Sequence, residues 1–154
     1  MIKKAVTASV IALFFGSAAL FSQTSTWLQN YEKAAALSKK TGKVLLIDFS
    51  GTDWCPWCIK LDREVFSQKA FKNYAAKNLV LMLADFPRNK ELPAELVKQN
   101  EALAKKHGIQ GFPTVVLLRP DGKPIAQTGY LEGGPNAYVK HLQELIRKDR
   151  ARNP

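Results

Sequence analysis

Four stretches of the chain have the hydrophobic pattern of β-strands. Residues 44–50 and 79–86 are continuous apolar runs, which is typical of strands buried on both faces. Residues 114–118 and 124–130 flank the turn sequence Arg-Pro-Asp-Gly-Lys, so they predict a hairpin. A single charge, Asp48, interrupts the first apolar run.

Apolar residues at helical spacing, with capping residues at the ends, predict helices between these strands. The first predicted helix begins at Ser25 or Thr26 and ends at Gly42. The second begins at Cys55 or Pro56 and continues to residue 78, with a break near Ser67. The last two cover 93–108 and 136–150. Ile59, Val65 and Phe66 are expected on the buried side of the second helix. The order of elements predicts an α/β fold with one central mixed sheet of about four strands and helices on both faces.

The first 22 residues have the layout of a secretory signal peptide. Lys3 and Lys4 precede 17 uncharged residues, and small residues follow near Ala19 and Ser22, where cleavage is expected. An uncleaved membrane anchor is the alternative, although the apolar run is short for a span of roughly 20 residues. We therefore expect a signal at 1–22 and one exported domain at 23–154, either periplasmic or secreted.

The composition is that of a globular protein, with 46% hydrophobic and 23% charged residues. The net charge is +10, and +8 remains once Lys3 and Lys4 are removed. A basic surface attracts nucleic acids and anionic membranes. Here, however, the cations are scattered over predicted helices, so we expect solvated helix faces and no nucleic-acid partner.

Cys55 and Cys58 are the only cysteines in the chain. A zinc site needs at least about three protein ligands, and His107 and His141 are not at zinc-finger spacing from the pair. Haem attachment needs a histidine directly after the second cysteine, where the chain has Ile59. A structural disulfide would close a very short loop and add little stability. A redox pair is the favoured interpretation, and metal carriage is a less favoured alternative.

The predicted local structure suits redox chemistry. Cys55 falls at the N-terminus of a helix, where free N–H groups and the helix dipole stabilise a thiolate. Cys58 lies one turn later on the same face, so it can attack a mixed disulfide formed by Cys55. Pro56 suits the first helical position. No cofactor is expected besides the Cys55–Cys58 pair.

Two segments resemble the thioredoxin superfamily, and most closely its exported bacterial thiol–disulfide oxidoreductases. They are 45–58, with an aspartate on the strand and a tryptophan before the first cysteine, and 107–125. The resemblance extends over about residues 26–147 and implies a thioredoxin-like fold. It also implies that Cys55 is the nucleophile, that Cys58 is the resolving thiol, and that Pro113 is a cis-proline beside them. The backbone at Phe112 would pair with an extended substrate.

The resemblance further implies that Asp48 moves the proton of Cys58. One departure bears on this role, because the loop from Asp48 to Cys55 is one residue longer than in ordinary thioredoxin. Trp54 and Trp57 are expected to pack and to contact substrate. The charged residues after the pair are expected to form a solvated helix face: Lys60, Asp62, Arg63 and Glu64.

These features predict a monomeric thiol–disulfide oxidoreductase that acts on protein thiols and disulfides outside the cytoplasm. Trp57 carries no positive charge to hold the Cys55 thiolate, which indicates a reductase or interchange protein and not a strong oxidase. An exported reductase needs an electron donor, and a membrane protein is expected in that role. The alternative function is a non-catalytic module that binds peptides through Phe112, Pro113 and Trp57.

Overall fold

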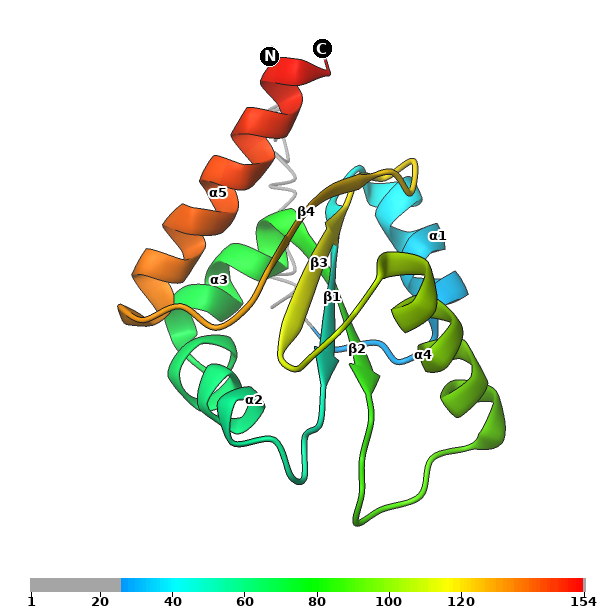
Figure 1. The fold of residues 1–154 in the computed structure, drawn as a ribbon. Helices are drawn as coiled ribbons and strands as arrows, with labels where there is room; N and C mark the ends of the chain where they lie inside the picture. Colours follow the sequence, from blue (N-terminus) through cyan, green and yellow to red (C-terminus); the bar gives the residue numbers. More distant parts are fainter. Residues whose placement is uncertain (1–25, 154) are drawn as a thin grey trace, which may run out of the picture.

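The computed structural model describes residues 26–153. A four-stranded mixed sheet in the order β2-β1-β3-β4 forms the centre of the molecule (Figure 1). Its strands are β1 (Val44–Ser50), β2 (Leu79–Asp85), β3 (Thr114–Leu118) and β4 (Pro124–Thr128). β1 pairs parallel with β2 and antiparallel with β3, which pairs antiparallel with β4. The predicted mixed sheet and hairpin are confirmed, and β4 ends two residues earlier than predicted.

The helices follow the predicted order. They are α1 (Tyr31–Thr41), α2 (Pro56–Leu61), α3 (Lys69–Asn78), α4 (Ala94–His107) and α5 (Gly134–Arg152). A π-helical turn, η1 (Asp62–Phe66), follows α2 directly, and Ser67 ends it. The predicted break near Ser67 is therefore confirmed.

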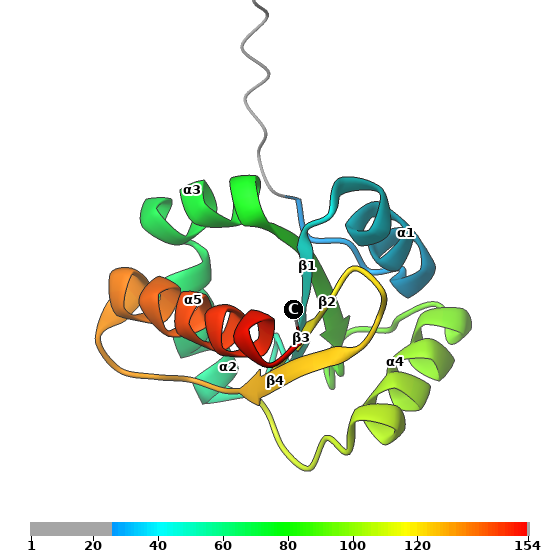
Figure 2. The same ribbon diagram turned by 90° about the horizontal axis from the view of Figure 1, so that it is seen from above.

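Helices cover both faces of the sheet, as predicted. Figure 2 shows α2, α3 and α5 on one side and α1 and α4 on the other. Successive residues of β1 point to opposite faces, and every one of them is buried. Val44 and Leu46 pack in the core beneath α2, α3 and α5, whereas Leu45, Ile47 and Phe49 pack in the core beneath α1 and α4. By this alternation Asp48 belongs to the face that α2 covers.

The first helix begins later than predicted. α1 starts at Tyr31, after the N-cap Asn30, whose side-chain oxygen accepts a 2.9 Å hydrogen bond from the backbone N–H of Lys33. The preceding segment is extended, and Leu28 forms a parallel bridge with Met82 of β2. The prediction of an earlier start was wrong because the open edge of β2 supplies hydrogen bonds to this segment.

Two further sequence expectations need correction. Ile59 is 46% exposed, and Cys58 and Leu61 form the buried side of α2 in its place. α5 begins at Gly134, two residues before the predicted start. Val65 and Phe66 are buried as expected. The predicted signal at 1–22 lies outside the described residues, and within 26–153 no helix is long and apolar enough to cross a bilayer.

Candidate active site

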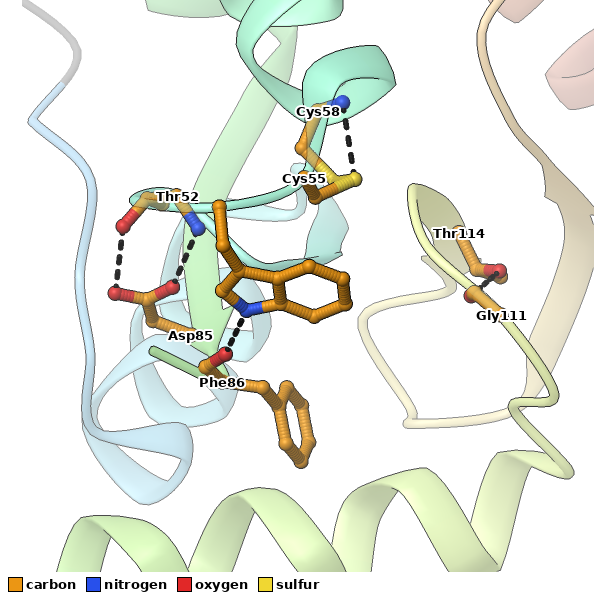
Figure 3. Close-up of a disulfide and its surroundings, with 8 residues drawn as sticks. Thr52, Cys55, Cys58, Asp85, Phe86, Gly111 and Thr114 are labelled. Carbon is orange, nitrogen blue, oxygen red and sulfur yellow. Dashed lines mark hydrogen bonds between the residues drawn. A yellow bond between two sulfur atoms is a disulfide. The ribbon is translucent and has the colours of Figure 1, made fainter. Parts of the chain in front are cut away.

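The two cysteines lie where β1 ends and α2 begins. Cys55 is the N-cap of α2, Pro56 is its first residue, and a disulfide joins Cys55 to Cys58 (Figure 3). The Cys55 sulfur accepts a 3.2 Å hydrogen bond from the backbone N–H of Cys58. Each cysteine is only 4% exposed. The sulfur at position 55 is therefore held against the free N–H groups of a helix N-terminus, where a thiolate is stabilised.

The loop before Cys55 is tied to the end of β2. Thr52 donates two hydrogen bonds to the carboxylate of Asp85, from its backbone N–H at 3.0 Å and from its hydroxyl at 2.8 Å (Figure 3). The ammonium of Lys90 lies 2.7 Å from the same carboxylate, which is almost fully buried. Asp53 accepts hydrogen bonds from the backbone N–H groups of Arg88 and Asn89. The sequence did not reveal these partners of the loop, which are more than thirty residues away.

Trp54 packs in a cluster of aromatic side chains. Its indole N–H donates a 2.7 Å hydrogen bond to the carbonyl of Phe86. Its ring meets the Phe112 ring edge-on at 6.1 Å between centroids, and Phe112 stacks on Phe86 at 4.9 Å. The guanidinium carbon of Arg88 lies 3.6 Å from the centre of the Trp54 ring. Trp54 and Phe112, which are far apart in the sequence, thus belong to the same aromatic cluster.

Pro113 follows Phe112 through a cis peptide bond, as the resemblance implied. The hydroxyl of Thr114 donates a 2.7 Å hydrogen bond to the carbonyl of Gly111, which closes the segment around this bond. In Figure 3 the segment from Gly111 to Thr114 lies across from the disulfide. The contact between the Phe112 ring and Trp54 links this segment to the residue that precedes Cys55.

Asp48 and Cys58 line the same pocket, which has a volume of about 260 Å³. Asp48 is 7% exposed, and its Oδ1 has no hydrogen-bond partner among residues 26–153. Burial, together with the smaller effect of the nearby carboxylates of Asp62 and Asp85, raises the pKa of Asp48 to about 8. Asp48 therefore points toward α2 despite the longer loop, and it is suited to exchange a proton near neutral pH.

Asp62 was missed as a site residue. It was expected on a solvated helix face, but it lines the pocket of Asp48 and Cys58 and raises the pKa of Asp48. The hydroxyl of Ser67 donates a 3.1 Å hydrogen bond to its carboxylate. Its spacing was the available signal, because a residue four positions after Cys58 lies on the same helix face.

Trp57 lies between the two cysteines in the sequence, and 54% of its surface is accessible. Its ring lies 5.4 Å from that of Tyr130, and the ammonium of Lys60 is 5.0 Å and 4.9 Å from the two ring centres. The Tyr130 hydroxyl donates a 2.6 Å hydrogen bond to Glu64, which lowers the pKa of that carboxylate. Tyr130 was not singled out from the sequence, because only the fold brings the end of β4 to α2.

The two histidines lie in separate environments. The centre of the His107 ring lies 6.2 Å from that of the Phe49 ring, and burial lowers the pKa of His107. The His141 Nε2 atom is 3.0 Å from the Thr128 hydroxyl. In the described part of the chain, His, Cys, Asp and Glu side chains do not gather in a group of three that could hold a metal ion.

Comparison with known proteins explains this arrangement. The family described as "Thioredoxin-like domain" matches residues 31–146, which is most of the chain. This protein belongs to the thioredoxin-like domain family. The thioredoxin-like chain is 32% identical to disulfide bond reductase DsbH of Chlamydia pneumoniae over 119 residues, which cover 77% of this chain and 72% of DsbH.

A solved structure of DsbH oxidoreductase has the same thioredoxin-like fold. It superimposes with a TM-score of 0.77 at 29% identity and covers 92% of this chain and 95% of that one. The thiol:disulfide interchange protein DsbD of Pectobacterium atrosepticum is 29% identical over 134 residues. The chain spans only 21% of that longer protein. Given this family and the Cys55–Cys58 disulfide, the protein is a thioredoxin-like thiol–disulfide oxidoreductase.

Proposed function

We propose that this protein reduces disulfides in other proteins outside the cytoplasm, with Cys55 as the nucleophile and Cys58 as the resolving thiol. The observation that carries the proposal is the cysteine pair at the start of α2, whose second member shares a pocket with the buried Asp48. The similarity to a disulfide bond reductase supports the reductive direction. The pair itself carries the two electrons, and we propose no other cofactor.

The reaction starts from the dithiol form. The Cys55 thiolate, stabilised by the N–H groups of α2, attacks one sulfur of a substrate disulfide. A bond forms between Cys55 and that sulfur, and the other substrate sulfur leaves as a thiolate. The contact between the Cys58 N–H and the Cys55 sulfur supports this assignment of the nucleophile.

Resolution requires Cys58 to lose its proton. We propose that the ionised fraction of Asp48 accepts this proton, because a pKa of about 8 keeps part of the carboxyl group ionised near neutral pH and suits exchange with a thiol. The Cys58 thiolate then attacks the Cys55 sulfur, the mixed disulfide breaks, and the second substrate sulfur leaves as a thiolate. The two departing thiolates take up protons, so the substrate gains two electrons and the pair is oxidised to its disulfide.

The substrate would lie as an extended segment against the Phe112–Pro113 backbone. The segment from Gly111 to Thr114 lies across from the cysteine pair in Figure 3, and the Phe112 ring contacts that of Trp54. Trp57 is more than half exposed and supplies a second apolar contact. Extended peptides are bound in this way through backbone hydrogen bonds, while side-chain contacts add specificity.

The proposal places the protein outside the cytoplasm as a monomeric domain over 23–154, after removal of the signal at 1–22. Its oxidised pair must be reduced again by a dithiol, which we propose belongs to a membrane protein.

An insulin-reduction assay with dithiothreitol as the electron source tests the reaction. The wild type should accelerate precipitation of the insulin B chain, and Cys55→Ser should abolish the acceleration. In a separate incubation with insulin and no dithiothreitol, pre-reduced Cys58→Ser should accumulate a mixed disulfide through Cys55, visible as a heavier band on a non-reducing gel. A Cys55→Ser variant as active as the wild type would refute the reductase mechanism.

A peptide-binding module without turnover is the second candidate, favoured by the exposed Trp57. It predicts that Cys55→Ser and wild type bind an unfolded cysteine-free peptide equally well and that neither reduces insulin. Catalysis by the wild type and its loss in Cys55→Ser would exclude this candidate.

A further inference from the structure

A basic pocket lies at the end of the molecule opposite the disulfide. It has a volume of about 560 Å³. Four cations line it, together with Tyr74: Lys43, Lys77, Arg147 and Arg150. None of the described residues that line it carries a carboxylate. In Figure 1, α1, α3 and α5 end at this pole, whereas α2 begins at the other.

The charge of this pocket exceeds what the helices neutralise. Each helix C-terminus carries roughly half a negative charge, so the three that end here contribute about −1.5 against four cations. Asp149, which precedes Arg150 on α5, is occupied by a bidentate ion pair with Arg119 at 2.6 Å and 2.7 Å. One pocket cation is fixed in place, because the Lys43 ammonium donates a 2.7 Å hydrogen bond to the carbonyl of Ala76. The pocket therefore has an excess of positive charge.

The path of the chain brings the N-terminal segment to the same pole. Leu28 pairs with Met82 in a parallel bridge, so the extended segment runs in the direction of β2. Thr26 consequently lies nearer to Leu79, where β2 begins and α3 ends.

We propose that the basic pocket binds the phosphate headgroups of an anionic membrane surface. Phosphate groups complement four cations, and a pocket of this size accommodates a small headgroup. Each Lys or Arg close to an anionic bilayer adds to the attraction. Binding at this pole turns the disulfide away from the bilayer and toward soluble substrates. The sequence indicated scattered cations, and the fold gathers them from three separate segments: the loop before β1, α3 and α5.

Vesicle co-sedimentation of the full chain tests the proposal. Binding to vesicles of phosphatidylcholine alone is compared with binding to vesicles that also contain phosphatidylglycerol. Apolar contacts contribute to binding in both cases, so the difference measures the attraction to the anionic headgroups. The pocket variant combines Lys77→Gln, Arg147→Gln and Arg150→Gln. A matched control removes three exposed α4 cations through Lys98→Gln, Lys105→Gln and Lys106→Gln.

The wild type and the control should bind more strongly when phosphatidylglycerol is present, and high salt should remove the gain. In the pocket variant this gain should weaken by roughly fivefold for each cation removed. Equal gains in the pocket variant and the control would overturn the proposal. So would tight binding of inorganic phosphate in calorimetry that the pocket variant loses while its vesicle binding is unchanged.

The outcome is independent of the reductase reaction. The pocket variant keeps all residues near the disulfide, so its insulin reduction in solution should equal that of the wild type. This assay also verifies that the variant is folded. Loss of vesicle binding with normal insulin reduction supports the membrane proposal alone.

Discussion

A carboxylate at position 48 is costly for the fold and useful for the chemistry. Asp48 lies in a strand that is otherwise apolar, apart from its terminal serine, and its Oδ1 lacks a hydrogen-bond partner among residues 26–153. Burying a charge without a partner is unfavourable, so the proton stays on this carboxyl group near neutral pH. The sequence predicted the burial of Asp48, but it could not show that Cys58 and Asp62 share its pocket.

The raised pKa of Asp48 predicts a pH-dependent gain in stability for Asp48→Asn. The folded protein holds this proton up to about pH 8, whereas the unfolded chain releases it from its ordinary value of 3.8. Wild-type stability therefore falls with rising pH across this window, by about 1.4 kcal/mol for each pH unit. Urea unfolding from pH 4 to 9 should show the free-energy advantage of Asp48→Asn growing until about pH 8 and then levelling.

Glu144→Gln, which removes an exposed carboxylate on α5, serves as the control and should show no such growth. A constant difference between Asp48→Asn and wild type over the whole pH range would contradict the raised pKa.

Ile59 shows where helical periodicity misleads. The spacing of Ile59 from Val65 and Phe66 suits one face of a continuous α-helix, and this made Ile59 appear buried. In the structure α2 gives way to the π-helical turn η1, which has more residues per turn and rotates later residues around the axis. Val65 and Phe66 are buried and Ile59 is exposed because the helix is not uniform.

Gly51 permits the position of Trp54. A Cβ atom at Gly51 would lie 2.5 Å from the indole ring, which a hydrogen bond to Phe86 and the Arg88 guanidinium hold in place. Gly51→Ala should therefore destabilise the protein by about 1–3 kcal/mol in urea unfolding. Gly111→Ala is the matched control, because its Cβ would meet no atom within 4 Å. Equal stability of the two variants would show that the ring moves freely.

At the scale of elements, the start of α1 was the least predictable boundary. Ser25, Thr26 and Asn30 are all suitable N-cap residues, and local sequence does not choose among them. The choice depends on β2, whose edge pairs with Leu28 and keeps the preceding residues extended. A contact between segments more than fifty residues apart decides this boundary, and single-sequence periodicity does not contain it.

The cap at Asn30 gives a prediction for this element. Asn30→Ala removes the hydrogen bond from the Lys33 N–H to the Asn30 side chain and should lower the free energy of unfolding by about 1 kcal/mol. Gln29→Ala, at the exposed neighbouring position, should change it little. Thermal or urea unfolding of both variants gives the comparison. An unchanged stability in Asn30→Ala would mean that α1 does not depend on its cap.

At the scale of the whole molecule, the order of elements was sufficient to predict the fold. Alternating buried strands and helices, followed by a hairpin, specify a mixed sheet covered on both faces, and this is the observed fold. The location of the cysteine pair was predictable because Cys55 follows β1 after one short loop. The tertiary partners of the site were not predictable, since Asp85, Phe86 and Tyr130 lie at or just after the ends of other strands. The basic pocket was not predictable either, because its cations come from three separate segments.

The central claim is that the Cys55–Cys58 pair is a reductant. Trp57 provides no positive charge to hold the Cys55 thiolate, and a less stabilised thiolate makes a couple less oxidising. The most direct test is the reduction potential, obtained by equilibrating the protein in glutathione or dithiothreitol buffers and trapping the free thiols. We predict a value at or below about −180 mV, in the range of disulfide isomerases and thioredoxin. A value near −120 mV, that of a strong oxidase, would contradict the account.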